Sequence, residues 1–384
     1  MSERVLMVGG FPDAVRAAAI YAVDLVYLQE KSRLKQGEVK GATELFVGDV
    51  NDSTWPYWEA ILPRAHQIRP FTHAVSLTEF GLEFAALFGQ LQDLRATSLS
   101  AVQSTRDKFL MREHMRGLDS TVDFSACNDP AKMAEFLEHH SQVIVKPSKG
   151  TASAHVTLAT NVADVFRHVD APLDPRFGEW IMEEYVEGEE YSVESFTSHG
   201  KHTVLAITET ITTGAPTFLE IGHICPAVID PKLRDEIERT VRAFLTVVSL
   251  DFGPAHTEVR VTPTGSVKII ESQTRPGGDH ISLLVKLATG NDLYDLTIRE
   301  LLRLPVTIQD GPRQTVAVEF LVPPEGQVTQ ISGLEELRAL PFIAESRINV
   351  RPGDTVRRPD SSFTRNYGHL VVFGTSPGTN AWNV

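Results

Sequence analysis

Two strand-like segments near the middle of the chain carry residues suited to binding a metal ion and a phosphate. Glu258 lies in the first segment, and Glu271, Gln273 and Arg275 follow in the second. A Thr-Pro-Thr-Gly turn signal ending at Gly265 separates them, which predicts a hairpin with Glu258 and Glu271 on one side. Alternate strand residues share a face, so Gln273 would lie beside Glu271. Carboxylate and amide oxygens suit Mg²⁺ with substrate phosphates, and a guanidinium suits a phosphoryl or carboxylate group. The alternative is a salt-bridged strand pair.

A lysine at the end of an apolar run indicates a second candidate site. Lys146 follows Val-Ile-Val, and burying an ammonium group without an anion is costly, so it needs a partner. The small residues of 147–153 let backbone N–H groups approach phosphate oxygens closely. The segment lacks the G-x-x-x-x-G-K-[ST] pattern of a Walker A loop. A turn whose lysine reaches out to solvent is the alternative.

The acidic segment from Glu183 to Glu190 forms a third candidate. An apolar strand that ends in an acidic turn can offer backbone groups to a purine edge. A carboxylate in such a turn can accept two hydrogen bonds from the hydroxyls of a ribose. A solvated acidic turn between strands is the alternative.

Short apolar runs alternate with helical patterns in the first hundred residues, which predicts an open parallel βαβ sheet. No G-x-G-x-x-G follows the first run, so no dinucleotide site is predicted there. The expected strands are 5–8, 25–28, 43–47 and 73–77, with a helix over 14–21 and a loop over 48–52.

The following two hundred residues combine alternating strands with a few helices. The predicted strands are 142–146, 155–158, 180–186, 191–197, 201–210, 253–261 and 266–271, and the predicted helices are 105–115, 233–248 and 283–302. Pro, Gly and short β-type runs fill the remainder, which predicts a small β-rich final unit.

Composition bounds the class of protein. The 384 residues include 36 Lys and Arg and 50 Asp and Glu, for a net charge of −14. This length predicts two or three packed units, and a pI near 5.4 argues against nucleic-acid or anionic-membrane partners. No apolar run reaches the roughly 18 residues of a membrane span. Two cysteines cannot form a disulfide framework and the first residues lack a signal peptide, so we expect a cytoplasmic protein.

The order and spacing of these segments resemble the ATP-grasp superfamily over about residues 1–305. The similarity is greatest to carboxylate–amine ligases of the L-amino acid ligase type, including bacilysin-type dipeptide ligases. The residues that carry the resemblance are Thr105-Arg-Asp-Lys108, Val143-Ile-Val-Lys146-Pro147, Glu183 to Glu190, Glu258, and Glu271-Ser-Gln-Thr-Arg275-Pro-Gly-Gly278.

The resemblance implies an α/β protein with the ATP-grasp fold, built from three units. The first is an N-terminal Rossmann-like parallel sheet domain over 1–104. The second is an ATP-grasp domain over 105–305, with a lid at about 115–185. The third is a small C-terminal β-rich domain over 306–384, whose segment 320–374 looks like that of the same branch.

The resemblance also implies how ATP is bound. Lys108 and Lys146 would contact the phosphates from two sides, and Arg275 would stabilise the transferred phosphate. The remaining nucleotide-binding residues would be Gly150, Thr151 and Ser153 in a mobile loop over the phosphates, Glu183, the backbone of Glu184 and Val186 at the adenine, and Glu190 at the ribose.

A metal site and a substrate site complete the implied arrangement. Glu258 and Glu271, with Gln273, would carry two Mg²⁺ ions, with Mn²⁺ as an alternative. Gly277 and Gly278 would let the backbone approach the substrate. Two departures from the family pattern stand out: the 147–153 loop has one glycine where many relatives have two or more, and Gln273 replaces the usual Asn.

An E-x-G-H segment resembles the amino-acid ligase branch specifically. It runs from Glu220 to His223, where Glu220 would face a substrate ammonium and His223 a carboxylate or an intermediate. His223 thus joins Lys146 and Arg275 in the expected catalytic set, and both segment residues join Arg275 at the substrate. A structural histidine is the alternative for His223.

The implied activity is ATP-dependent coupling of a carboxylate, expected to be an amino acid, to an amine. The partners would be small molecules, with no nucleic acid and no membrane, and relatives of this type are often homodimers. A carrier protein remains open as the acceptor. The alternatives are a biotin-carboxylase-like or purine-biosynthetic ATP-grasp enzyme and a non-catalytic nucleotide sensor.

Overall fold

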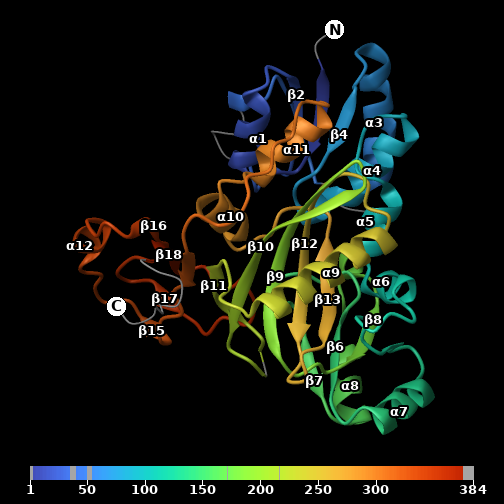
Figure 1. Cartoon of the computed structure of the whole chain (residues 1–384), viewed down its shortest axis with the longest axis vertical. Helices are drawn as coiled ribbons and strands as arrows, with labels where there is room; N and C mark the ends of the chain where they lie inside the picture. Colours follow the sequence, from blue (N-terminus) through green and yellow to red (C-terminus); the bar gives the residue numbers. More distant parts are fainter. Residues whose placement is uncertain (1–2, 35–39, 50–53, 171, 216, 375–384) are drawn as a thin grey trace.

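Four β-sheets organise the part of the chain that the structure, a computed structural model, describes. The described residues are 3–34, 40–49, 54–170, 172–215 and 217–374. Figure 1 shows the N-terminal sheet and its helices at one end of the long axis and the C-terminal strands projecting to one side. At the other end are α7 (Pro130–His139) and α8 (Val162–Val169), two helices of the segment predicted as the lid. The large central sheet connects all three.

The N-terminal sheet is parallel, with strand order β3-β2-β1-β4. Its elements are β1 (Arg4–Val8), α1 (Pro12–Ala19), β2 (Asp24–Gln29), β3 (Glu44–Val47), α3 (Trp55–Ile68), β4 (His73–Val75), η2 (Glu79–Gly81) and α4 (Leu82–Leu91). Val5 and Met7 pack on one face, and Leu6 and Val8 pack with Trp58 on the other. The predicted βαβ sheet is therefore confirmed, although β4 ends two residues early. Residues 50–52 of the expected loop lie outside the described residues.

The helical stretch predicted over 105–115 is confirmed except at Asp107, where two helices meet. They are α5 (Leu99–Arg106) and α6 (Lys108–His114). Asp107 between them has extended backbone angles, and its carboxylate accepts hydrogen bonds from the N–H groups of Phe109 and Leu110. This side-chain cap begins α6 at Lys108 and fixes where that lysine points.

The segment predicted as the lid, about residues 115–185, contains an antiparallel sheet with the order β5-β8-β6-β7. This sheet is called the lid sheet below. The elements of the segment are β5 (Phe124–Ala126), α7 (Pro130–His139), β6 (Val143–Pro147), β7 (Thr157–Ala159), α8 (Val162–Val169), η3 (Pro175–Phe177) and β8 (Trp180–Glu184). Met133, Val145 and Met182 form its core with the two helices. The strand–loop–strand prediction for 142–158 is confirmed, but β7 starts at Thr157 because His155 has a φ of 61°.

The central sheet has eight strands in the order β13-β12-β9-β10-β11-β14-β18-β16. These are β9 (Glu189–Ser198), β10 (Lys201–Thr212), β11 (Glu220–Cys225), β12 (Gly253–Val261), β13 (Val267–Gln273), β14 (Val316–Phe320), β16 (Ile343–Ile348) and β18 (Gly368–Phe373). Helix α9 (Pro231–Val247) covers β10, β12 and β13 through Ile237, Val241 and Phe244. The predicted β12–β13 hairpin is confirmed.

The helical stretch predicted over 283–302 is confirmed except for an interruption at residues 290–292. It is divided into α10 (Ile281–Thr289) and α11 (Leu293–Leu301). Gly290 ends α10 with a left-handed φ of 85°, and the Asp292 carboxylate caps the start of α11. Because of this break, α10 packs on β10, β11 and β14 of the central sheet, whereas α11 packs against α1 of the N-terminal unit.

The C-terminal strands extend the central sheet. Strand β14 pairs with β11, β18 pairs with β14, and β16 forms the outer edge. The other C-terminal elements are the pair β15 (Gly326–Gln327) and β17 (Thr355–Val356), and the short helix α12 (Leu334–Arg338). A domain boundary at residue 306 thus remains a prediction, because the sheet runs across it.

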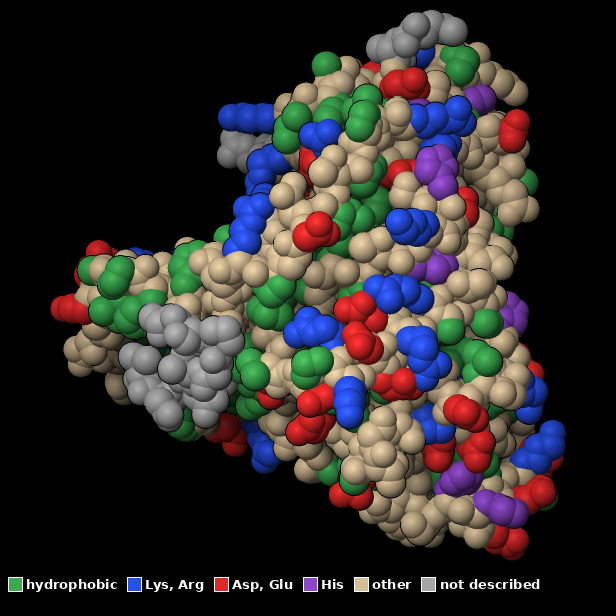
Figure 2. Space-filling view, in the orientation of Figure 1, with side chains coloured by type: hydrophobic (Ala, Val, Ile, Leu, Met, Phe, Trp, Pro, Cys, Tyr) green, Lys and Arg blue, Asp and Glu red, His purple; other side chains and the backbone are tan. Residues whose placement is uncertain are grey.

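The described surface carries charges of both signs. On the face shown in Figure 2, Lys and Arg side chains are interspersed with Asp and Glu side chains over the centre of the molecule. Within the described ranges, every helix is too short or too polar to traverse a lipid bilayer. Cys127 and Cys225 are both free thiols.

Candidate active site

A cavity of about 210 Å³ lies between the lid sheet and the central sheet. Lid residues that line it include Lys146 and Glu183, and central-sheet residues that line it include Glu258 and Glu271. The cavity also takes in the loop after β6 and the start of α10. Segments that are 100 residues or more apart in sequence therefore form one polar pocket.

Glu258 and Glu271 lie directly opposite each other in the β12–β13 register. Burial and the charge of Glu271 raise the pKa of Glu258. Burial would also raise the pKa of Glu271, but Lys108 and Lys146 lower it to about 2. Gln273 donates from Nε2 to Oε1 of Glu271 at 2.7 Å, and its buried Oε1 has no hydrogen-bond partner among the described residues. Two facing carboxylates and a free amide oxygen fit a hard divalent cation.

His256 lies beside this acidic pair and contacts Glu258. Its Nδ1 bonds to Glu194, and its Nε2 lies 3.3 Å from Oε1 of Glu258. Burial would lower the pKa of His256, but the two carboxylates raise it to about 10, so the ring is a cation between two anions. The other oxygen of Glu194 accepts the N–H of Gly277 at 3.0 Å. A Cβ at Gly277 would lie 2.7 Å from Glu194, which explains the glycine.

Lys108 joins the acidic pair to the loop after β6. Its Nζ lies 2.8 Å from Oε2 of Glu271 and donates to the carbonyl of Gly150 at 2.9 Å. Burial would lower the pKa of Lys108, but Glu271 raises it. Lys108 is therefore a buried cation that links the loop at Gly150 to the carboxylate of Glu271.

Lys146 is paired with Glu183 at 2.6 Å, and both side chains are buried. The other oxygen of Glu183 accepts from Nε of Arg112 at 2.8 Å. Arg112 is completely buried and also donates to the carbonyls of Ile269 and Ile270. Burial lowers the pKa of Lys146, and Lys108 and Arg112 reinforce this. Glu183 thus positions Lys146 and connects β8 to α6, and Arg112 connects α6 to β13.

Arg275 lies at the end of the cavity nearest the N-terminal sheet. Its Nε donates to Glu79 of η2 at 2.8 Å, and its Nη1 donates to the carbonyl of Pro276. Gly278, three residues on, lines the cavity, whereas Gly277 does not. The structure therefore brings Arg275 and Gly278 to the pocket and keeps Gly277 behind it.

The loop after β6 has an unusual backbone. Gly150, Thr151 and Ser153 line the cavity, as the loop prediction requires. Ala152, Ser153 and His155 have φ values of 58°, 55° and 61°. These are left-handed conformations in which glycine is least strained. Three residues other than glycine therefore adopt the left-handed conformation in this loop, at positions where glycine would be less strained.

The acidic segment after β8 is held by Arg260. This arginine donates to the Val186 carbonyl at 2.9 Å and to Glu190 at 2.8 Å. Its guanidinium lies 5.8 Å from the ring centre of Tyr185 and 5.9 Å from that of Phe218. Both rings line the cavity, so they offer apolar surface beside a carboxylate. Glu184 also lines it, but its N–H donates to the Asp123 carbonyl within the lid.

A second group of charged residues also lines the pocket, around Glu220 and Asp279. Glu220 and Asp279 line the cavity, and burial, Asp279 and Glu258 raise the pKa of Glu220 well above its ordinary value. Arg365 pairs with Asp279 at 2.7 Å, donates to the Glu220 carbonyl and lies 3.5 Å from the ring centre of Phe320. A protonated or ammonium-paired carboxyl is thus favoured at Glu220.

His223 lies behind Glu220 and does not line the cavity. It is fully buried, and its Nε2 is 3.7 Å from Oε2 of Glu220. Burial lowers its pKa to about 4, so the ring is neutral at pH 7. Neither ring nitrogen has a hydrogen-bond partner among the described residues. His223 therefore lies next to Glu220 but outside the lining of the cavity, so the structure does not bring it into the pocket.

Sequence reasoning missed four charged residues that position the site. His256 and Arg260 share the face of Glu258 at the two-residue period of β12, and Arg112 lies one helical turn after Lys108. Those periods were usable signals. Arg365 comes from a C-terminal segment with no regular pattern, and no sequence signal points to it.

Family comparisons agree with this geometry. Residues 139–283 match the ATP-grasp domain, and residues 319–379 match L-amino acid ligase C-terminal domain 2. The chain therefore carries an ATP-grasp domain match in its middle and an L-amino acid ligase C-terminal domain match near its end. The ATP-grasp domain implies the use of ATP, and the C-terminal match includes Phe320 and Arg365.

Curated relatives are distant. An uncharacterised Sinorhizobium fredii protein, y4rH, is 25% identical over 239 residues, which is 61% of this chain and 49% of the relative. Alanine–anticapsin ligase of Bacillus subtilis is 24% identical over 230 residues, which is 53% of this chain and 48% of the relative. The chain spans about half the length of the curated relatives it matches.

Solved structures share the fold over nearly the whole chain. An L-amino acid ligase from Bacillus licheniformis superposes with a TM-score of 0.83 at 19% identity, covering 98% of this chain and 94% of the other. A phosphoribosylglycinamide synthetase from Anaerococcus prevotii gives 0.73 at 16% identity, covering 98% and 95%. The ATP-grasp fold, with its parallel N-terminal and antiparallel central sheets, is therefore shown.

Proposed function

We propose that this chain is an ATP-dependent carboxylate–amine ligase that forms an amide or peptide bond with release of ADP and phosphate. The observation that carries the proposal is the convergence of opposed carboxylates and buried cations on one cavity. Glu258 and Glu271 face each other there beside Lys108, and the Glu220 group lies at the same pocket. A phosphate-handling site is thus adjacent to a site for an ammonium group.

ATP is proposed to lie between the lid and the central sheet. The adenine would contact the Tyr185 and Phe218 rings and the backbone at Val186, and Glu190 would accept the ribose hydroxyls. Arg260 already orients both Glu190 and the Val186 carbonyl. The phosphates would then point along β12 toward the buried lysines.

Two Mg²⁺ or Mn²⁺ ions are proposed to lie at Glu258 and Glu271, with the Gln273 oxygen as a further ligand. When bound, the ions would neutralise phosphate charge and hold the phosphate oxygens in place. Two observations support this proposal: the buried Gln273 oxygen has no hydrogen-bond partner among the described residues, and the neighbouring charge of Glu271 helps to raise the pKa of Glu258.

The first chemical step makes the carboxylate reactive. A carboxylate oxygen forms a bond to the γ-phosphorus, and the bond from that phosphorus to the bridging oxygen breaks, so ADP leaves with the electron pair. Lys108, Lys146 and Arg275 would stabilise the charge on the transferring group. The product is an acyl phosphate, and no nucleophile of the protein is consumed.

The second step forms the amide. The amine attacks the acyl carbon, phosphate leaves with the electron pair of the C–O bond, and the nitrogen loses a proton. Glu220 is the group best placed to orient the ammonium, because it lines the cavity near Gly278. Asp279 and Arg365 would hold that end of the substrate.

The cavity also supports closure around the ligand. Its volume of about 210 Å³ is below the ~300 Å³ at which typical small-molecule sites begin, so ATP needs the lid to open. The Lys108 contact with Gly150 ties the loop down, and phosphates would compete for that lysine. Closure would then keep water from the acyl phosphate.

Other ATP-grasp activities are less well supported. Biotin carboxylases and purine-biosynthetic enzymes share the fold, but the match over 319–379 is to an amino-acid ligase domain. A non-catalytic sensor has no need for the opposed carboxylates. The identity of the carboxylate, the acceptor (an amine or a carrier protein) and a homodimeric state are proposals that rest on resemblance.

The deciding experiment is a screen of carboxylate–amine pairs for ATP-dependent phosphate release, with product mass measured. The proposal expects release with at least one pair and a product mass equal to the two substrates minus water. Glu138→Gln, an exposed change on α7, serves as the control for Glu271→Gln. Bicarbonate-dependent release alone would support the carboxylase alternative, and silence with every pair would support the sensor.

A further inference from the structure

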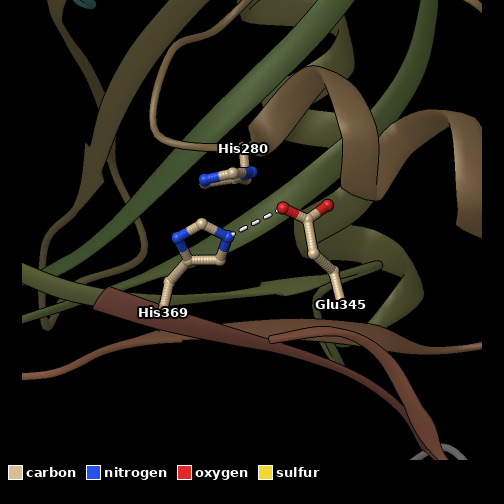
Figure 3. Close-up of side chains that lie close together, drawn as sticks. All are labelled: His280, Glu345 and His369. Atoms are coloured by element: carbon tan, nitrogen blue, oxygen red, sulfur yellow. Dashed lines mark hydrogen bonds and ion pairs between the residues drawn. The ribbon is translucent and has the colours of Figure 1, made fainter. Parts of the chain in front are cut away.

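A cluster of two histidines and one glutamate lies outside the cavity, where the C-terminal strands meet the start of α10. His280 comes from the residue before α10, Glu345 from the edge strand β16 and His369 from β18. Their ligand atoms all lie within 4.8 Å of one another. Figure 3 shows the His280 ring over the His369 ring, with the Glu345 carboxylate reaching across to His369.

Three independent backbone segments create this arrangement. Arg347 pairs with His369 in the β16–β18 register, so Glu345, two residues along, is the diagonal neighbour of His369 on the same face. His280 reaches them because it has a left-handed φ of 64°, which is uncommon for a residue other than glycine. Its ring centre lies 4.0 Å from that of His369.

We propose that His280, Glu345 and His369 form a binding site for a divalent transition metal of the zinc class. Imidazole nitrogens and one carboxylate are the donor set that such ions prefer, whereas Mg²⁺ prefers oxygen. Ligand atoms in a tetrahedral zinc site lie roughly 3.3 Å apart, given bonds of about 2 Å. His369 Nε2 and Glu345 Oε1 are already 3.0 Å apart. His369 is buried and Glu345 is half-exposed, so an adjustment of the glutamate closes the site around the ion.

The position of the site gives the metal a structural task. His280 follows Asp279, which lines the cavity and pairs with Arg365. A metal at the cluster would tie the loop of Asp279 to the two outermost strands of the central sheet. The site is separate from the carboxylates assigned to Mg²⁺, and it does not depend on the proposed ligase activity.

The test is titration of the metal-free full chain with Zn²⁺ alone, followed by calorimetry and by metal analysis after gel filtration. Glu345→Gln and His280→Asn are the test variants, since asparagine tolerates a left-handed backbone. Each should weaken Zn²⁺ binding at least ~10-fold. Glu336→Gln, on the nearby exposed helix, is the matched control and should bind like wild type.

The variant Glu271→Gln distinguishes Zn²⁺ binding at this cluster from Zn²⁺ binding at the carboxylates of the cavity. It should retain the tight Zn²⁺ site, and excess Mg²⁺ should not compete for it. Co²⁺ should give visible absorption bands that disappear in Glu345→Gln. The proposal is overturned if wild type retains no zinc, if both cluster variants bind as tightly as wild type, or if Glu271→Gln removes the binding.

Discussion

Glu258 lies directly opposite Glu271 on adjacent strands, yet the two carboxyls have opposite electrostatic surroundings. Burial beside Glu271 raises the pKa of Glu258, whereas Lys108 and Lys146 hold that of Glu271 near 2. Glu271 is therefore the carboxylate that its neighbours hold most firmly in the charged form, and a cation placed between the two would lower the pKa of Glu258.

The first prediction concerns this charged member. Glu271→Gln keeps the shape of the side chain and removes the negative charge that pairs with Lys108. ADP release in the presence of substrates should fall at least ~100-fold, as when a main electrostatic contact is lost. Steady-state ADP release measures it, with Glu138→Gln as the control. Activity near wild type would remove the metal assignment.

The second prediction concerns Arg275, whose planar fork contacts Glu79 and the Pro276 carbonyl. Arg275→Lys keeps the charge but loses the two-pronged geometry. We expect kcat to fall ~100-fold. Arg64→Lys, on the exposed face of α3, should leave kcat unchanged. A loss of less than about threefold in Arg275→Lys would mean that this arginine does not contact the transferring phosphate.

The third prediction concerns acid stability at Glu183. Burial would raise its pKa, but Arg112 and Lys146 lower it from 4.5 to about 2. A carboxyl with a lowered folded-state pKa stabilises the fold above the unfolded pKa and loses that effect as pH falls toward 2. The contribution of this charge to stability at pH 7 is on the order of 3 kcal/mol. Urea unfolding should therefore show Glu183→Gln to be less stable than wild type at pH 7, with the gap narrowing below pH 4.

The control for that experiment is again Glu138→Gln, whose side chain is exposed. Its stability should follow wild type at every pH. A gap between Glu183→Gln and wild type that stays constant from pH 7 to pH 3 would show that packing, and not the charge of Glu183, stabilises this region.

The fourth prediction concerns the nucleoside end of the cavity. Arg260→Lys loses the simultaneous contacts with Glu190 and the Val186 carbonyl. The KM for ATP should rise ~10-fold while kcat changes little, since the arginine is remote from the transferring phosphate. Initial-rate kinetics with varied ATP measure both, with Arg64→Lys beside it. An unchanged KM would place the nucleoside elsewhere.

The fifth prediction concerns the loop after β6, in which Ala152 has a φ of 58°. Ala152→Gly should leave stability unchanged or raise it by up to about 1 kcal/mol, because the left-handed strain is relieved. Ala134→Gly in helix α7 is the matched control and should lower stability by about 1 kcal/mol. Urea midpoints decide the point, and equal losses in both variants would contradict it.

The sequence predicted elements with strong local patterns. The buried strand of Val5–Val8 and the β12–β13 hairpin were found because apolar runs and turn residues are local signals. The breaks at Asp107 and at residues 290–292 were missed because each is only one to three residues long inside an otherwise helical pattern. The carboxylates of Asp107 and Asp292 cap the second helix at each break, and hydrophobic periodicity does not indicate where a cap begins a new helix.

The candidate site was predictable only where its residues fall in order along the chain. Glu258 and Glu271 could be placed together because they flank one turn. Arg365 pairs with Asp279, which lies 86 residues earlier in the sequence, and no local sequence pattern predicts a contact between them. The roles proposed for these residues remain to be tested by the variants above.

The continuity of the central sheet limits how this protein can be divided or recombined. Strand β14 covers the edge of β11, and apolar residues from both sides of residue 306, such as Leu284 and Val318, share one core cluster. A chain cut at that point would expose an unpaired strand edge and apolar surface, which invites aggregation. Exchange of the C-terminal segment between relatives would succeed only if the incoming segment brought its own antiparallel strand in register with β11.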